Sequence, residues 1–451
     1  MSCTRVLAIL FLTATGVLAA PNHLRRNTNT SEMARFPRPT FGGAYTSIPI
    51  FVTVVTHTEQ TTRYDLLPAA FESARTNTYL FASMLAEHGV QYDFQSDWTF
   101  LAAVTNFDKT GHAETGGTNI VKWIEDLGFS IDPHNHVGQS SYNSADLAAL
   151  ITLCGATPSP VVGGFLAYPI TNSQWALYQH TMTGAVYTAT TWTAGTMWGG
   201  GSGSHSLDTN TWFSGVYCPR DATNYWQHKD GNLPDIGTYG GRYQAWTNLD
   251  MLLAMRSAGL LCTGSIYTCT IMAHVTDLTP AYIADFDAQL QDYTNRPNIR
   301  WVNLVQLTNI WATEYGRRPS RLPWVLTNDY DADGIIDGWE VSNFCGTCEI
   351  DGTQDDDGDG WSDSEEFTAD TQPTNSSSAY SNNWSAVEDY SILDIYNSSA
   401  GRLYTVESTT NLVETNWTPV ITDVPGNGGL LQITLTNTLS SQFYRSIVAR
   451  P

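Results

Sequence analysis

Short apolar runs alternate with amphipathic stretches from Ile48 to about Thr313. Apolar runs of strand length are found at 50–55, 91–94 and 129–131, and again at 267–273 and 300–304. Stretches with apolar residues at helical spacing are found at 68–87, 119–127, 144–153 and 281–293. Alternating strands and helices predict a parallel sheet or a (β/α) barrel, whose functional residues follow the carboxyl ends of the strands.

Two polar motifs stand at such strand ends. Thr56-His57-Thr58-Glu59 closes the first apolar run, and Asp132-Pro133-His134-Asn135-His136 closes the third. Residues two apart on a strand point the same way, so each motif presents a pair of side chains to one side. Two imidazoles and a carboxylate, with a position left for water, form the ligand set of a hydrolytic zinc site. The predicted ligands of a divalent metal, with zinc favoured, are His57, Glu59, His134 and His136.

A metal-dependent hydrolase also needs a proton acceptor near the activated water. Asp97, just past the second predicted strand, is the best-placed carboxylate. His57 is the alternative base if it is not a metal ligand. Asp132 is expected to orient a histidine ring through the second ring nitrogen.

The segment from about Thr190 to Gly241 is rich in Gly, Trp, Tyr and Ser and has weak periodicity. It predicts long loops or short antiparallel strands over one face, where loops commonly shape a binding site. Its tryptophans are either platforms that stack on sugars or ordinary packing residues, and they are Trp192, Trp198, Trp212 and Trp226.

The first twenty residues are typical of a secretory signal peptide. Arg5 supplies the charge, residues 6–12 the apolar core, and residues 17–20 a small-residue cleavage site. That core is too short to span a bilayer, and no later stretch of the sequence predicts a membrane span. We therefore expect a protein that is secreted or held at the cell surface, with a polar, Pro-rich linker at 21–47.

Removal of the signal peptide leaves six cysteines, an even number that suits an oxidising compartment. Local pairing would join Cys262 with Cys269 and Cys345 with Cys348, and would leave Cys154 with Cys218. This is one of fifteen possible connectivities. Cys345-Gly-Thr-Cys348 is alternatively half of a zinc site.

The formal net charge of −23 is concentrated in one segment. Residues 328–370 contain fifteen acidic residues and no Lys or Arg, which disfavours nucleic acid as a partner and favours a cation. Two stretches have the spacing of a calcium loop, with alternating carboxylates, a glycine at the turn and a final glutamate. The first comprises Asp329, Asp331, Asp333, Asp337 and Glu340, and the second comprises Asp355, Asp357, Asp359, Asp363 and Glu366.

This pair of loops resembles the thrombospondin type 3-like repeats that serve as stalks in secreted bacterial proteins, and the resemblance implies a calcium-stabilised stalk at 328–375. Strand-like alternation from 385 to 451 predicts a small β-sandwich. It resembles the C-terminal modules of some secreted bacterial enzymes, which implies carbohydrate binding or attachment to the cell surface.

The order of motifs at 48–315 resembles the polysaccharide deacetylase superfamily, whose domain is a distorted (β/α) barrel. The family's Thr-Phe-Asp-Asp motif falls on residues 56–59, so Glu59 stands at the position of a metal-binding Asp. Thr58 stands at the position of the catalytic base and cannot act as one. The family's paired histidines are four apart, whereas His134 and His136 are two apart. The late segment 271–274 is similar to the family's last motif, which implies that His274 is the general acid.

These observations predict a secreted, metal-dependent hydrolase that removes an acyl group from a polysaccharide. One alternative is a glycoside hydrolase that uses Glu59 and Asp97 as its paired carboxylates. Another is a polysaccharide-binding or surface protein without catalytic activity.

Overall fold

The computed structural model describes residues 47–59, 61–164, 172–198, 213–239, 241–323, 329, 331–344, 352–387, 389–413, 416–436 and 442–451. The expected signal peptide, residues 21–46 of the expected linker, Trp212, Cys345 and Cys348 lie outside these residues. The described chain forms two compact units. The larger unit contains the described residues up to Asp331 together with 340–344, and the smaller unit contains 332–339 and the residues from 352 onward.

The larger unit is built on a parallel sheet with the order β10-β1-β2-β3, in which β11 also pairs with β1. Its strands are β1 (Ile50–His57), β2 (Asp93–Ser96), β3 (Ser130–Pro133), β10 (Tyr267–His274) and β11 (Ile299–Trp301). Every residue of β1 is buried, which explains its continuous apolar run. Parallel pairing in register brings the carboxyl ends of β1, β2 and β10 to one edge of the sheet.

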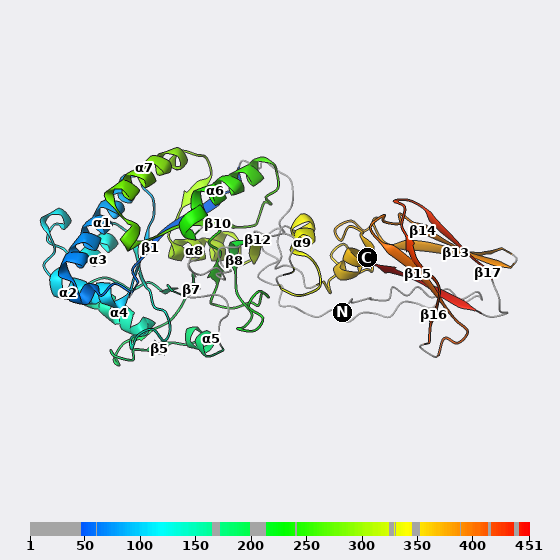
Figure 1. Ribbon diagram of the computed structural model, residues 1–451, viewed down its shortest axis with the longest axis horizontal. Helices are drawn as coiled ribbons and strands as arrows, with labels where there is room; N and C mark the ends of the chain where they lie inside the picture. Colours follow the sequence, from blue (N-terminus) through cyan, green and yellow to red (C-terminus); the bar gives the residue numbers. More distant parts are fainter. Residues whose placement is uncertain are drawn as a thin grey trace. The chain divides into compact units, whose positions relative to one another are not determined.

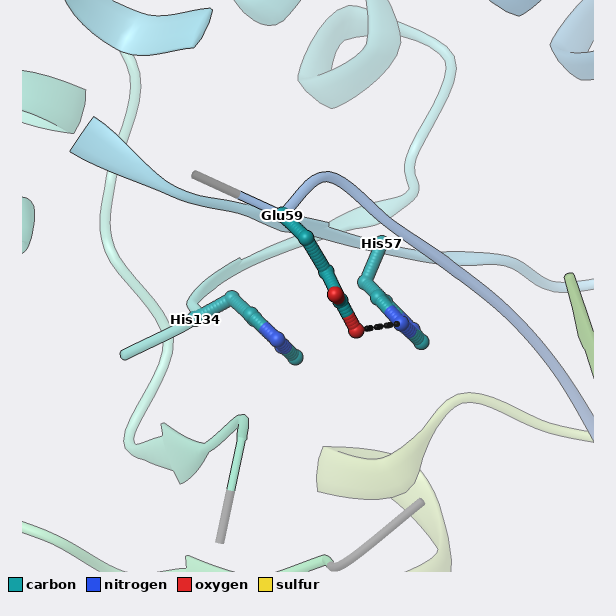
Figure 2. Close-up of side chains that lie close together, drawn as sticks. All are labelled: His57, Glu59 and His134. Atoms are coloured by element: carbon teal, nitrogen blue, oxygen red, sulfur yellow. Dashed lines mark hydrogen bonds and ion pairs between the residues drawn. The ribbon is translucent and has the colours of Figure 1, made fainter. Parts of the chain in front are cut away.

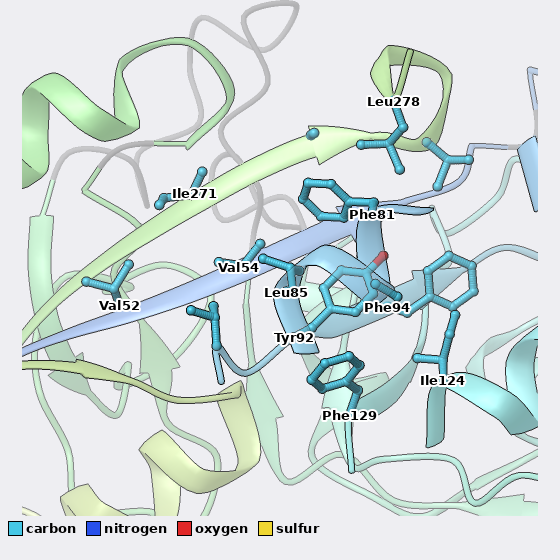
Figure 3. Packing of buried hydrophobic residues seen from close by; sticks show 14 of the residues in the cluster. Val52, Val54, Phe81, Leu85, Tyr92, Phe94, Ile124, Phe129, Ile271 and Leu278 are labelled. Carbon is cyan, nitrogen blue, oxygen red and sulfur yellow. The ribbon is translucent and has the colours of Figure 1, made fainter. Parts of the chain in front are cut away.

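Helices cover this sheet and close its core (Figure 1). They are α1 (Pro68–Glu87), α2 (Trp98–Phe107), α3 (Ile120–Asp126), α4 (Ser144–Leu153), α6 (Gly241–Ser257), α7 (Pro280–Thr294) and α8 (Leu304–Glu314), with short 3-10 turns at Tyr64–Leu66, Ala113–Thr115 and Val275–Asp277. Helix α1 has the predicted bounds, begins with Pro68 at its first turn and is followed by Gly89 at φ 67°. Figure 3 shows how Phe81 and Leu85 of α1 pack with Val54 of β1 in the main core.

A second sheet has the order β12-β8-β9-β7-β4 and mixes parallel with antiparallel pairs. Its strands are β4 (Val161–Val162), β7 (Thr196–Met197), β8 (Phe213–Tyr217), β9 (Asp235–Ile236) and β12 (Ser320–Pro323). The parallel sheet with its helices confirms the predicted α/β class, whereas the described strands of this unit form separate sheets and no closed barrel. The strand–helix alternation breaks down in the irregular middle of the chain, where most strands are two residues long. Strand β12 also continues the fold beyond the expected boundary at residue 315.

The described part of the aromatic middle segment belongs to the larger unit. It also contains α5 (Asn172–Tyr178) and the hairpin of β5 (Met182–Thr183) and β6 (Thr191–Trp192). Trp192 and Trp198 are buried, and the indole nitrogens donate to Ser159 O and Thr270 Oγ1, respectively. These two side chains are packing residues and offer no face to a sugar.

The predicted disulfide pairing is wrong in two of its three bonds. Cys154, Cys218 and Cys269 have free, buried thiols, whereas Cys262 is disulfide-bonded. Cys269 lies in the middle of β10, where its thiol donates to the carbonyl groups of Tyr239 and Ala245. Its side chain is therefore part of the core under α6 and cannot reach a bond with Cys262.

The smaller unit contains two three-stranded antiparallel sheets, β13-β14-β17 and β16-β15-β18. The strands are β13 (Ser381–Val387), β14 (Tyr390–Tyr396), β15 (Leu403–Thr409), β16 (Thr418–Pro425), β17 (Leu431–Thr436) and β18 (Phe443–Ala449). Both sheets contribute to one core, which includes Leu393, Leu435, Val406 and Val448. Helix α10 (Asp363–Ala369) begins within the second acidic loop, whereas α9 (Asp337–Phe344), which begins within the first, is divided between the two units. Among the described residues, no helix has the length and apolar character needed to cross a bilayer.

Candidate metal centre

The site lies where the first sheet's strands end. His57 is the last residue of β1 and is in register with His274, the last residue of β10. On its other side β1 pairs with β2, which places Gln95 beside His57. His134 follows β3 and forms a parallel bridge with Gly163. Residues that are far apart in the sequence therefore meet at one edge.

His57, Glu59 and His134 each offer a ligand atom, and these atoms lie within 4.8 Å of one another. Figure 2 shows the three side chains next to one another, with the carboxylate of Glu59 directed to the ring of His57. His57 Nε2 is 3.3 Å from Glu59 Oε1, and the rings of His57 and His134 are stacked with centroids 4.6 Å apart. Three of the four predicted ligands are thus brought together.

The other two histidines lie at the border of this group. The ring centroid of His274 is 4.3 Å from that of His57, and His274 Nε2 is 3.7 Å from Glu59 Oε1. The ring of His136 is perpendicular to that of His134, with centroids 5.0 Å apart. Four imidazoles and one carboxylate therefore gather at the sheet edge.

The charges of the site suit a cation. The hydrogen bond from His57, aided by the neighbouring His274 and His136, holds the pKa of Glu59 at about 2 despite partial burial. Burial, together with the nearby His57, His136 and His274, holds the pKa of His134 well below its ordinary value. Glu59 is therefore an anion and His134 a neutral imidazole at neutral pH. His134 Nε2 is buried and has no hydrogen-bond partner among the described residues, a costly arrangement that a bound metal ion would remedy.

Asp97, the predicted base, is 3% exposed and caps helix α2. Its carboxylate accepts hydrogen bonds from Phe100 N at 3.1 Å, Thr58 Oγ1 at 2.8 Å and Thr99 Oγ1 at 3.0 Å. Asp97 N in turn donates to Thr58 Oγ1 at 2.8 Å. Burial raises the pKa of Asp97 to about 6. Asp97 thus anchors Thr58, the residue between His57 and Glu59, and its action as a base stays a prediction.

Sequence reasoning missed Gln95. Asp132 was expected to contact a histidine ring directly, but the side chain of Gln95 lies between the two groups. His134 Nδ1 is 3.2 Å from Gln95 Oε1, and Gln95 Nε2 donates to Asp132 Oδ2 at 3.3 Å. The available signal was a glutamine two residues before Asp97, at the end of a strand whose residues are all buried.

In the smaller unit, the carboxylates of the second acidic loop are grouped closely enough to bind one cation. Carboxylate oxygens of Asp355, Asp357 and Asp359 lie within 4.8 Å of one another. Asp355 accepts from the backbone N–H groups of residues 358, 359 and 360, which fixes the tight turn. Asp363 and Glu366 are buried at the start of α10, and both oxygens of Asp363 lack a hydrogen-bond partner among the described residues. Burial and neighbouring carboxylates raise the pKa of Asp363 to about 8 and that of Glu366 to about 7.

The residues of the first acidic loop are divided between the two units. Asp331, Asp337 and Glu340 are buried. Asp331 also forms an ion pair with the buried Arg321, at 3.2 Å. Burial of acidic side chains is unusual without a partner of opposite charge.

No protein-family model matches the sequence, and no curated protein is similar to it. Among solved structures, the chain is similar to one named as a polysaccharide deacetylase from Mycobacterium smegmatis, with 11% identity, a TM-score of 0.36, and coverage of 63% of this chain and 95% of that chain. The chain is also similar to PuuE allantoinase, with 9% identity, a TM-score of 0.39, and coverage of 65% of this chain and 99% of that chain. A third similar structure is named as a probable polysaccharide deacetylase from Pseudomonas aeruginosa PAO1, with 10% identity, a TM-score of 0.39, and coverage of 59% of this chain and 92% of that chain. Because these TM-scores are below 0.5, the function proposed below depends on the residues of the site.

Proposed function

We propose that the larger unit is a metal-dependent hydrolase that removes an acyl group from a carbohydrate. The observation that carries this proposal is the grouping of ligand atoms of His57, Glu59 and His134 within 4.8 Å of one another, with His134 Nε2 buried and without a partner among the described residues. Two imidazoles and a carboxylate match the ligand preference of zinc. The carbohydrate substrate is what the motif resemblance implies.

His57, Glu59 and His134 would hold the ion, and the remaining residues of the site would supply binding and proton transfer. Zinc in such a site polarises a carbonyl group and activates water. We assign the proton transfer to His274, whose side chain is 16% exposed, compared with 4% for His57. Its Nε2 atom accepts a proton from the attacking water and returns it to the leaving group. Asp97 holds Thr58 in place through two hydrogen bonds. Because Thr58 lies between His57 and Glu59, Asp97 also maintains the spacing of these two residues.

The glycosidase alternative requires Glu59 and Asp97 to act on opposite sides of a glycosidic bond. Asp97 is buried and accepts from three donors, and Glu59 contacts two imidazoles. This arrangement favours the metal-dependent reaction.

The deciding experiment incubates the purified full-length protein with acetylated glycans in the presence and absence of zinc. Zinc-dependent release of acetate supports the proposal. New reducing ends without metal dependence would instead identify a glycosidase, and binding without turnover would identify a carbohydrate-binding protein.

We also propose that the second acidic loop binds calcium through Asp355, Asp357, Asp359, Asp363 and Glu366. Five carboxylates at this spacing are typical of a calcium site, and the buried oxygens of Asp363 need a cation. We extend this assignment to the first loop on its sequence pattern. Export of the protein, and attachment to a glycan or cell surface through a sandwich-like C-terminal unit, complete the proposal.

A further inference from the structure

A row of buried, hydrogen-bonded polar side chains leads to His134, and the proposed function does not explain it. It runs from Asp132 through Gln95 to His134, and all three side chains are at most 4% exposed. Asp132 lies on β3 and Gln95 on the neighbouring β2, directly opposite each other in the parallel register. These three hydrogen-bonded side chains therefore lie at the edge of the first sheet, next to the proposed metal centre.

Three hydrogen bonds hold the carboxyl group of Asp132 in place. Ser130 Oγ and Ser159 Oγ both donate to Asp132 Oδ1, at 2.6 Å and 2.5 Å. The other oxygen, Oδ2, accepts from Gln95 Nε2 at 3.3 Å. The carboxyl group of Asp132 thus accepts from three donors, and the third is the NH₂ group of Gln95, which therefore faces Asp132.

That orientation determines which atom of Gln95 faces His134. With the NH₂ group toward Asp132, the carbonyl oxygen Oε1 lies 3.2 Å from His134 Nδ1. An amide oxygen can only accept, so Nδ1 of His134 must carry a proton. The other nitrogen, Nε2, is then the one with a free lone pair, and it is the buried atom that has no partner among the described residues.

The packing prevents Gln95 from turning away. A Cβ atom at Gly163 would lie 2.7 Å from Gln95 Oε1 and 2.8 Å from Pro133 O, so the backbone closes directly over the amide. Gly163 N donates to Pro133 O, and Asn135 N donates to Gly163 O, which ties this segment to both sides of His134.

We infer that Gln95 is a positioning residue, held by Asp132, that fixes His134 in the tautomer with the proton on Nδ1 and thereby presents Nε2 as a metal ligand. The inference rests on the proposed metal site for its purpose, but the tautomer is a property of the metal-free protein. Replacement of a residue that hydrogen-bonds to a metal-ligating histidine typically weakens metal binding by about 10- to 100-fold.

The test combines ¹⁵N spectroscopy of the histidine rings with zinc titration of the full-length protein. In the metal-free protein the His134 ring should carry its proton on Nδ1. Gln95→Met, which has a similar length but no strong acceptor, should lose this preference and bind zinc about 10- to 100-fold more weakly. Gln95→Glu keeps an oxygen toward His134, and its carboxyl group shares one proton with Asp132 because two adjacent buried carboxyl groups do not both ionise, so this variant should retain the tautomer.

Two results would overturn the inference: a proton on Nε2 of His134 in the unaltered protein, or an unchanged zinc affinity and tautomer in Gln95→Met. If the variant fails to fold, the spectrum of the unaltered protein still decides. If the unaltered protein has the predicted tautomer but binds no zinc, the proposed function fails while the tautomer assignment stands.

Discussion

The rings of His57 and His134 lie parallel, with an angle of 5° between their planes and 4.6 Å between their centroids. They come from the ends of β1 and β3, two strands separated by β2 in the sheet. Both rings are buried, and Glu59 contacts His57 from within the same group. Two buried imidazoles stacked beside an anion form a group whose electrostatics favour a bound cation.

Replacement of either stacked ring should abolish tight zinc binding. We expect His134→Ala to weaken zinc binding at least about 100-fold, because it removes one of three protein ligands. The dissociation constant is measured by competition with a chromophoric chelator, in excess calcium so that the acidic loops do not bind zinc.

The matched control for this prediction is His180→Ala, which removes an exposed histidine that follows α5. It should leave zinc affinity unchanged. Equal zinc affinity in His134→Ala and His180→Ala would exclude the proposed centre.

Variants of Asp97 separate its two candidate roles. Asparagine is also a good helix cap, so Asp97→Asn should keep stability within about 1 kcal/mol and turnover within about 3-fold, whereas Asp97→Ala should cost about 1 kcal/mol of unfolding free energy. Chemical denaturation and the acetate-release assay supply the two measurements. A loss of turnover of about 100-fold in a stable Asp97→Asn protein would instead establish Asp97 as the base.

The first sheet could be read from the sequence because its signals are local. The apolar run of β1 and the helical spacing of α1 predicted these elements, and the period of two placed His57 beside Glu59. The second sheet gave no such signal, since β4, β7 and β9 are two residues long and depend on pairing with distant strands.

Long-range contacts explain what was missed at the site. Gln95 and His134 are 39 residues apart, and nothing in either local sequence indicates that the amide would lie between Asp132 and the ring. The pairing of Cys262 with Cys269 failed for a similar reason. Sequence proximity favoured a bond, but the strand directs the Cys269 thiol toward α6.

His274 should affect turnover and not metal binding. His274→Gln keeps a polar side chain of similar reach but cannot carry a proton in the same way. We expect kcat to fall by about 100- to 10,000-fold, the usual range for loss of a general acid–base group. The zinc dissociation constant should stay within about 3-fold, as measured by the same chelator competition. A parallel loss of zinc would make His274 a ligand and leave the proton transfer to another group.

Calcium should control the stability of the smaller unit. Its second acidic loop leads into α10, where Ala369 joins the core of the two sheets and Arg402 donates to the carbonyl oxygens of Phe367 and Thr368. Loop and sheets should therefore unfold together. Saturating calcium should raise the melting temperature of this unit by about 10 °C or more, as scanning calorimetry of the full-length protein would show.

The same loop predicts an inverted pH dependence when calcium is removed. The pKa of Asp363 is raised to about 8 and that of Glu366 to about 7, so the folded unit holds these protons more tightly than the unfolded chain does. Their contribution is fully present below about pH 4, near the pKa values of unfolded carboxyl groups, and is lost as the pH rises to about 8. The melting temperature in chelator should thus fall between pH 4 and 8, and saturating calcium should remove that fall. Asp363→Asn should flatten the profile, whereas the exposed control Asp389→Asn should not. A profile in chelator that rises with pH in the unaltered protein would contradict this account of the loop, because it would mean that these carboxylates are stabilised as anions without a cation.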